Sequence, residues 1–145
     1  PGEPYEKFNH LNYFPAVLEA LREGSFKMEK MMILRGHEIL TATAWQTTTL
    51  FERVKGLLGK DGMGIDETLI LKPCHSIHTF FMKFAIDAVF LNSDCQIIAL
   101  YSDLKPYRAT WIYPHATRTI ELPAGTITKW SLKKGQHLNI RKAHV

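Results

Sequence analysis

The sequence predicts a mainly β protein: a compact antiparallel sandwich-like or barrel-like domain with one or two short helices and a helical N-terminal extension. Two observations favour this class. From residue 31 onward, short apolar segments alternate with turn residues about every ten positions. The composition is also that of an ordinary globular chain, with 46% hydrophobic and 22% charged residues in 145. A chain of this length forms one domain.

The N-terminal extension comprises residues 1–30, and residues 31–145 form a single β domain. Within the extension a short amphipathic helix is predicted over residues 15–22 because four apolar residues share one face at helical spacing: Phe14, Val17, Leu18 and Leu21. Gly24 suits its end. Such a helix needs a surface to pack on, so the extension is interpreted as a docking segment or as a partner-binding arm, including a contact between two copies of this chain.

The β domain is predicted to begin with a hairpin around Arg35-Gly36-His37, followed by a strand over residues 41–49. A short helix over residues 50–58 follows, with Thr49 and Glu52 spaced as a capping box. Further strands are predicted in the rest of the chain at residues 68–71, 77–83, 88–91, 96–101, 117–122, 126–131 and 137–140. The turn at residues 92–95 makes two of these strands a hairpin.

Charge is distributed unevenly along the chain. Residues 1–72 carry nine Lys or Arg against ten Asp or Glu, whereas residues 73–145 carry nine against four. A basic half attracts anions, but no nucleic-acid-binding motif accompanies it, so no nucleic-acid partner is expected. Because no run of about 18 apolar residues exists, no membrane partner is expected either.

The two cysteines, Cys74 and Cys95, are too few for a disulfide framework and too far apart for a zinc ribbon. A reduced, cytoplasmic protein is therefore the expectation. A signal segment removed before Pro1 remains open, because the chain starts without an initiator methionine.

Three stretches together resemble the domain-of-unknown-function 192 (DUF192) family: residues 52–59, 71–91 and 121–125. Residues 104–108 also fit a subgroup of it, and the resemblance extends from about residue 31 to residue 141. It implies a compact, mostly antiparallel β fold and no established reaction. Two positions depart from the family pattern. Cys95 stands in a hairpin turn where the family usually has glycine, and Gly135-Gln136 stands where it often has Gly-Asp.

A pocket is one interpretation of the predicted strand at residues 77–83. Alternation places His78, Phe80 and Met82 on one face of that strand, and a histidine and a thioether beside aromatic rings suit a small ligand. The same stripe equally suits a hydrophobic core containing one hydrogen-bonded histidine. Asp87 follows among apolar residues, so it is expected to be buried and paired, with Arg53 as its partner.

An aromatic and basic segment lies between two predicted strands, at Lys105, Tyr107, Arg108, Trp111 and Tyr113. Aromatic faces stack on sugars and bases, and Lys and Arg bind phosphate or carboxylate. An alternative is a long loop anchored by its aromatic rings. The predicted ligand-binding residues, with the floor of the site included, are His78, Met82, Lys105, Tyr107, Arg108, Trp111 and Glu121.

Catalytic and metal sites were weighed against this interpretation. Ligands for Cu(I) or Zn²⁺ are present in Cys74, His75, His78 and Met82, although their spacing matches no standard zinc pattern. Separately, Cys74 with His75 or His78 and Asp87 resembles a cysteine triad. Neither arrangement is fixed by the sequence, so no metal, no cofactor and no catalytic residue is assigned.

The leading hypothesis is a non-catalytic β domain that binds a small anionic or sugar-like ligand, or a peptide, through residues 105–113. One alternative is an uncharacterised enzyme that uses His78 and Asp87 as acid–base groups. Another is a structural or assembly domain that docks, or forms homo-oligomers, through residues 1–30.

Overall fold

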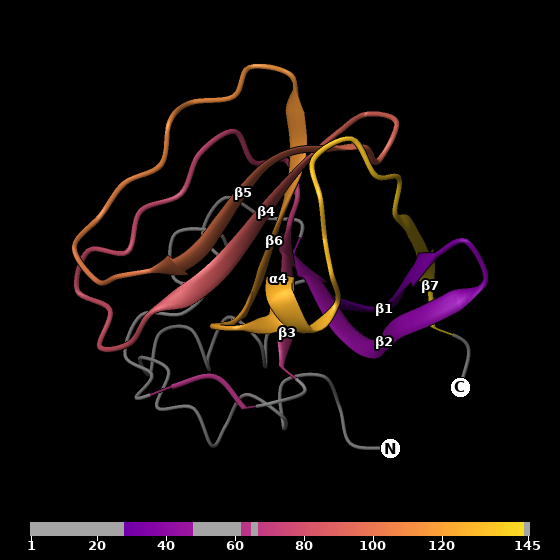
Figure 1. Ribbon diagram of the computed structural model, residues 1–145, viewed down its shortest axis with the longest axis horizontal. Coiled ribbons are helices and arrows are strands. Elements are labelled where there is room, and N and C mark those ends of the chain that lie inside the picture. Colours follow the sequence, from indigo (N-terminus) through magenta and orange to yellow (C-terminus); the bar gives the residue numbers. More distant parts are fainter. Residues whose placement is uncertain (1–27, 48–61, 65–66, 144–145) are drawn as a thin grey trace.

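One mixed sheet organises the protein. The computed structural model describes residues 28–47, 62–64 and 67–143, and within these ranges the sheet has seven strands (Figure 1). They are β1 (Met28–Arg35), β2 (Glu38–Thr47), β3 (Thr68–Leu71), β4 (Ile86–Asn92), β5 (Ile97–Leu104), β6 (Ala116–Pro123) and β7 (Asn139–Lys142), with one short helix, α4 (Thr126–Lys129). The strand order is β5-β4-β6-β3-β2-β1-β7. The predicted mainly β class is confirmed.

One strand pair differs from the antiparallel arrangement that the sequence predicts. β2 and β3 pair in parallel, with Ala44 opposite Thr68 and Thr47 opposite Leu71. Parallel neighbours need a long crossover between them, and residues 48–67 provide it. The helix predicted at residues 50–58, with its capping box, lies outside the described residues. The same holds for the helix predicted at residues 15–22.

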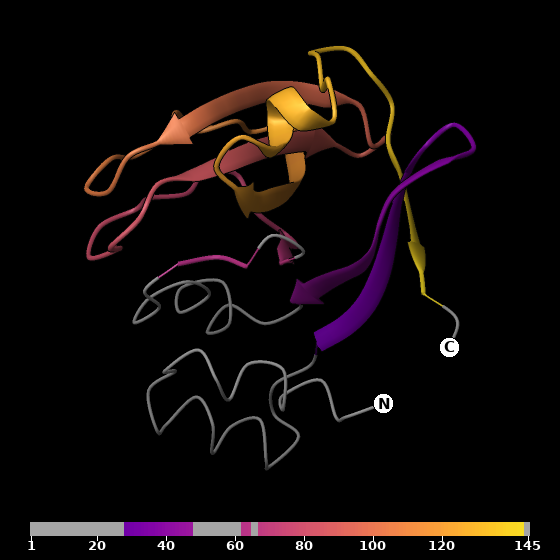
Figure 2. The same ribbon diagram turned by 60° about the horizontal axis from the view of Figure 1, so that its bottom comes forward.

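The sheet is folded over but not closed. In Figure 2, β1 and β2 curve away from the layer formed by β4, β5 and β6. Residues 135–142 connect the two open edges. The Ile97 N–H donates to the Gln136 carbonyl at 2.8 Å and the Leu138 N–H to the Cys95 carbonyl at 2.9 Å, beside the start of β5. β7 then pairs with β1. This segment gives an open sheet a barrel-like outline.

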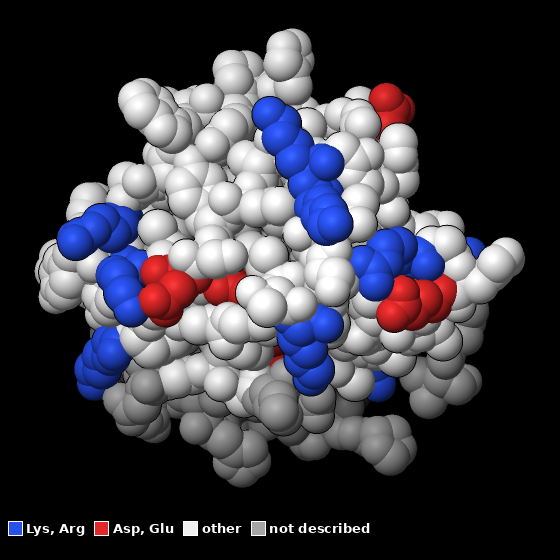
Figure 3. Space-filling model, viewed as in Figure 1, with Lys and Arg blue, Asp and Glu red and all other residues white. Residues whose placement is uncertain are grey.

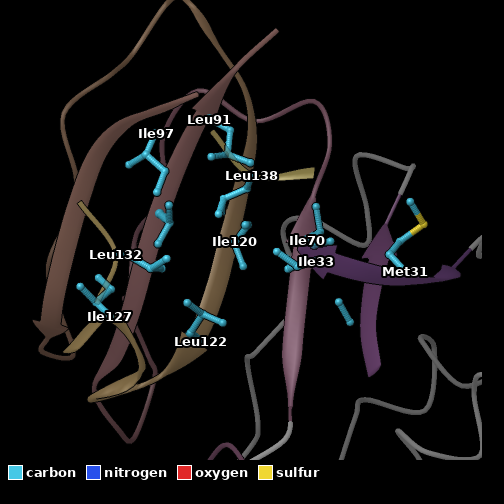
Figure 4. Packing of buried hydrophobic residues seen from close by; sticks show 12 residues of the cluster. Met31, Ile33, Ile70, Leu91, Ile97, Ile120, Leu122, Ile127, Leu132 and Leu138 are labelled. Carbon is cyan, nitrogen blue, oxygen red and sulfur yellow. The ribbon is translucent and has the colours of Figure 1, made fainter. Parts of the chain in front are cut away.

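Two hydrophobic clusters cover opposite faces of the sheet. The first lies inside the fold, where side chains from both halves of the sheet meet those around α4 (Figure 4); it includes Ile33, Ile70, Leu91, Ile97, Ile120, Leu122, Ile127, Leu132 and Leu138. The second includes Trp45, Leu69, Leu71, Ala88 and Phe90. Alternation along each central strand supplies both faces, so these strands are buried on both sides.

Two predicted strands are wrong. Residues 77–83 form no strand, because a turn at Thr79–Met82 and the positive φ of Phe81 (65°) break the extended backbone after a single bridge at His78. Residues 126–131 form helix α4 and the turn after it. Here the Asp87 carboxylate satisfies amide groups at the start of the helix, a contact that β propensity does not reveal.

The other predicted strands in the described ranges are present, some with shifted ends. β1 begins at Met28, three residues before the predicted domain boundary. No helix in the described ranges is both long and apolar enough to cross a bilayer.

Candidate functional site

Two loops are joined into one structure, which we call the double loop: residues 72–85 and residues 105–115. They run side by side away from the sheet (Figures 1 and 2). Backbone hydrogen bonds join them along their length. The Thr110 N–H donates to the Ile77 carbonyl at 3.0 Å, and the Tyr113 N–H donates to the His75 carbonyl at 2.8 Å. The double loop therefore has an internal hydrogen-bond ladder.

Thr79 is the main clamp between the two loops. It is fully buried. Its N–H donates to the Arg108 carbonyl at 2.8 Å, and its carbonyl accepts the Tyr107 N–H at 2.9 Å. Its hydroxyl donates to the Lys105 carbonyl at 2.6 Å and accepts the Arg108 N–H at 2.9 Å. One residue thus fixes the backbone of the segment that carries the predicted site.

Three aromatic rings anchor the double loop to the sheet. The Tyr101 and Tyr113 hydroxyl oxygens are 2.6 Å apart, and the Trp111 backbone N–H donates to the Tyr101 hydroxyl at 3.2 Å. The Phe90 ring packs on both, with its centroid 4.8 Å from that of Tyr113. Burial, together with the hydrogen bond to Tyr101, raises the pKa of Tyr113 from 10.0 to about 12. The loop after β5 is thereby tied to the core.

The outer surface of the double loop is apolar and aromatic. The rings of Phe81 and Trp111 are 73% and 79% exposed. Six large hydrophobic residues are exposed within the described ranges, and all except Ile39 lie on the double loop: Phe80, Phe81, Tyr107, Trp111 and Ile112. Such concentration differs from the scattered single hydrophobic residues of ordinary surfaces. It marks this surface, which we call the aromatic ridge, as the candidate site.

Two residues of the aromatic ridge have strained backbones. Phe81 and Tyr107 have φ angles of 65° and 59°, in the left-handed region that favours glycine. Their rings meet edge to face, with centroids 5.9 Å apart. Non-glycine residues in this region cost about 1–3 kcal/mol each and persist where surrounding structure enforces them. Here the Thr79 clamp enforces them, and two large rings are held outward.

Positive charge surrounds the aromatic ridge. The two loops contain four cationic residues, Lys72, Lys83, Lys105 and Arg108, and no Asp or Glu. Figure 3 shows blue side chains at the left margin of the molecule, where Figure 1 draws the two loops, with red side chains beside them toward the centre. Asp103 lies just outside and forms an ion pair with Lys105 at 2.5 Å. The site therefore offers both apolar contact and attraction for anions.

The structure divides the seven predicted ligand-binding residues into two groups. His78, Lys105, Tyr107, Arg108 and Trp111 are exposed on the double loop. Met82 and Glu121 are buried, the first beneath the loops and the second on β6 opposite Leu69 and Ala88, so neither is part of the exposed surface. Sequence reasoning missed Phe80, Phe81 and Ile112 as exposed members. The sequence signal that could have indicated them is that both loops are rich in aromatic residues and contain no acidic residue.

His78 and Asp87 make separate contacts. The His78 ring stacks on Phe80 with centroids 5.1 Å apart, and its Nδ1 accepts the Phe80 N–H. The fully buried Asp87 carboxylate accepts the Asp103, Gly125 and Ile127 N–H groups at 2.8–3.1 Å. Asp87 is buried, as predicted, and its predicted ion-pair partner Arg53 lies outside the described residues. Its contacts tie β4 to the end of β5 and to the start of α4.

The ligand set considered for a metal is also divided. Cys74 and Met82 are buried, whereas His75 and His78 are exposed. The Cys74 thiol donates to the Ser76 carbonyl at 3.3 Å. Within the described residues, no three His, Cys, Asp or Glu side chains are grouped as metal ligands would be.

A hollow of about 460 Å³ lies away from the double loop, between the β1–β2 turn, the β4–β5 turn and the start of β7. Its lining includes Cys95 and His137. The Arg118 guanidinium donates to the Cys95 sulfur at 3.1 Å. This arrangement places a thiol beside a positive charge, but it shares no residue with the aromatic ridge.

The sequence matches the DUF192 family, described as uncharacterised, over residues 32–140. It is also 38% identical over 63 residues to a UPF0127 protein of Pyrococcus furiosus. That alignment covers 43% of this chain and 53% of the relative, so the matched part spans about half of the relative's length.

Two solved structures resemble the fold. One is a protein of unknown function from Novosphingobium aromaticivorans, with a TM-score of 0.65 and 15% identity, covering 79% of this chain and 84% of that chain. The other, from Sinorhizobium meliloti, is described as a proposed transcription regulator; its TM-score is 0.64 and its identity 18%, with 79% and 94% covered. At these identities the likeness establishes the fold alone.

Proposed function

This chain belongs to the uncharacterised DUF192 family, and we propose from that premise that it is a non-catalytic binding module. Its ligand or partner is anionic, also offers apolar contacts, and is engaged through the aromatic ridge of the double loop. The main observation that supports this proposal is the concentration of exposed large hydrophobic side chains on the two joined loops.

Preorganisation supports this proposal. A mobile loop would lose conformational entropy on binding, whereas a loop already fixed in its bound shape avoids most of that cost. The Thr79 clamp and the Tyr101–Tyr113 anchor supply this rigidity. The strained backbones of Phe81 and Tyr107 hold their rings in solvent rather than against the core.

Charge supports an anionic partner. Arg108 is exposed on the ridge, and its guanidinium can donate several hydrogen bonds to a carboxylate or phosphate. Aromatic rings beside it can stack on a planar or apolar group of the same partner. Sugar phosphates, nucleotides and acidic peptides all combine these two features.

The exposed Trp111 provides a direct test. We expect the tryptophan fluorescence of the protein, to which Trp111 contributes, to change on titration with one member of a panel containing sugar phosphates, nucleotides and acidic peptides. Arg108→Ala should weaken that binding by about tenfold or more, since a hydrogen bond to a charged group contributes about 1.5–3 kcal/mol. Tyr107→Ala should also weaken it, since it removes a ring that stacks on the partner. Arg141→Ala, which removes an exposed arginine on β7, is the matched control.

Circular dichroism establishes that each variant is folded before its affinity is compared. Binding that survives both ridge substitutions, or that is weakened equally by Arg141→Ala, would place the ligand elsewhere on the molecule. A flat titration across the whole panel and across lipid vesicles would overturn the proposal.

A further inference from the structure

We infer that the partner of the double loop is the interface of an anionic membrane, on which the protein docks peripherally. This inference rests on the proposed function and names the class of partner. It also revises the expectation that no membrane is involved, which came from the lack of a spanning segment; docking at the surface of a bilayer needs none.

Exposure argues against a small ligand held in a pocket. A ring that lines a pocket has most of its surface covered by neighbours, yet Phe81, Trp111 and Ile112 are each more than 70% exposed. These side chains project from the molecule. A projecting apolar tip is suited to insertion into a deformable medium, and the boundary between lipid headgroups and acyl chains is such a medium.

The side-chain types are those of membrane interfaces. Tryptophan and tyrosine concentrate at headgroup level because each combines an apolar ring with a polar group. Trp111 and Tyr107 are of this kind, and Phe81 and Ile112 add purely apolar surface. Lysine and arginine can lie along the apolar surface while their charges stay in the polar layer.

The charge pattern agrees with an anionic leaflet. The two loops contain four cationic residues and no Asp or Glu, and Asp103, just outside them, pairs with Lys105. Each Lys or Arg near an anionic bilayer strengthens binding by about fivefold. Several cations together with inserted rings provide the two signals that stable peripheral binding requires.

The rigidity of the tip completes the inference. The clamp at Thr79 holds Phe81 and Tyr107 in place before any partner is present. Insertion then requires no folding step, so the apolar contacts contribute to binding without an ordering cost. An acidic peptide would satisfy the same charges, and the experiment below separates it from lipid.

The test is co-sedimentation of the full chain with vesicles of phosphatidylcholine alone, and with vesicles containing about 30% phosphatidylglycerol. We expect binding to the second kind only, a loss of binding in about 0.5 M NaCl, and a blue shift of the tryptophan emission, to which exposed Trp111 contributes. The pair Phe81→Ala/Trp111→Ala and the pair Lys105→Gln/Arg108→Gln should each weaken vesicle binding by about tenfold or more.

Matched controls are available outside the double loop. Ile39→Ala removes the exposed large hydrophobic side chain that lies outside the double loop among the described residues, and Lys133→Gln/Lys134→Gln removes two exposed cations after α4. Both variants should bind vesicles like the unsubstituted chain. If the chain does not bind vesicles but an acidic peptide binds the ridge, the membrane inference is overturned and the proposed function stands. If vesicles and the whole ligand panel fail, both fall. Vesicle binding that the ridge variants retain overturns the membrane inference.

Discussion

Cys95 shows how a single position can be predicted from sequence. The family pattern has glycine in this turn, which indicates a positive φ, and the structure gives Cys95 a φ of 57°. Gln136 is similar, because its side chain accepts the Lys133 N–H at 3.0 Å and so caps the turn where the family often has aspartate. Local backbone chemistry was therefore accessible from sequence.

The contacts of Asp87 and Thr79 were not accessible in the same way. The sequence indicated that Asp87 is buried, but its described partners are backbone N–H groups 16 to 40 residues away. Thr79 resembles any other threonine until the two loops meet. Hydrogen bonds between distant segments depend on tertiary placement, which local patterns do not encode.

Tyr113 makes the anchor of the double loop sensitive to alkaline pH. Its pKa is raised to about 12 when folded, against 10.0 for an ordinary tyrosine. Above pH 10.0 the unfolded chain loses this proton while the folded protein keeps it, so the free energy of unfolding falls between pH 10.0 and about 12. Below pH 10.0 this contribution is fully present.

Denaturation at a series of pH values measures this effect. We expect Tyr113→Phe to show a shallower fall in unfolding free energy over that window than the unsubstituted chain. In Tyr101→Phe, absorbance titration should place the Tyr113 pKa below 12 yet above 10.0, because burial still acts on it. Equal slopes in Tyr113→Phe and the unsubstituted chain would show that Tyr113 is not anchored as described.

At the scale of elements, strand prediction succeeded where a segment is buried in the sheet and failed in the double loop. β3 occurs at the predicted residues, since a short apolar run between polar residues is typical of a buried strand. Residues 77–83 also carry apolar side chains, but the turn at Thr79 directs Met82 inward and Phe81 outward. Apolar content alone could not distinguish a covered strand from a loop with exposed rings.

The parallel pairing of β2 with β3 had no local signal. A parallel neighbour is determined by the path of the crossover, and a sequence of short strands with turns favours antiparallel pairs. The candidate site could be predicted from the sequence only in part, again because tertiary contacts are not encoded locally. Loop composition indicated the aromatic and basic residues, whereas the joining of the two loops required the fold.

The clamp between the two loops can be tested at Thr79. Thr79→Val keeps the shape of the side chain but removes its hydroxyl, which leaves the part-buried Arg108 N–H and Lys105 carbonyl without that partner. We expect a loss of about 1–3 kcal/mol in unfolding free energy. Hydrogen exchange should also become faster at the backbone N–H groups of Tyr107 and Arg108, which donate hydrogen bonds to Thr79.

Thr79→Ser is the matched control, since it keeps the hydroxyl and removes one methyl group. It should retain slow exchange at both amides, at a cost of about 1 kcal/mol in stability. Equal exchange rates in Thr79→Val and the unsubstituted chain would show that the clamp does not order the double loop.

At the scale of the whole molecule, the sheet separates two regions with different chemistry. The double loop combines exposed rings with positive charge on one side. The hollow lined by Cys95 and His137 lies on another, at the turns beside β7. We propose that binding occurs at the double loop.

Chemical-shift mapping by NMR tests that claim most directly, because it locates binding on the folded chain. The short-chain lipid dihexanoylphosphatidylglycerol, added to isotope-labelled protein, should shift the Trp111 indole signal and the amides of residues 79–83 and 105–113. Signals from the hollow and from β7 should stay unchanged. Shifts centred on Cys95 and His137, with the double loop unaffected, would contradict the account.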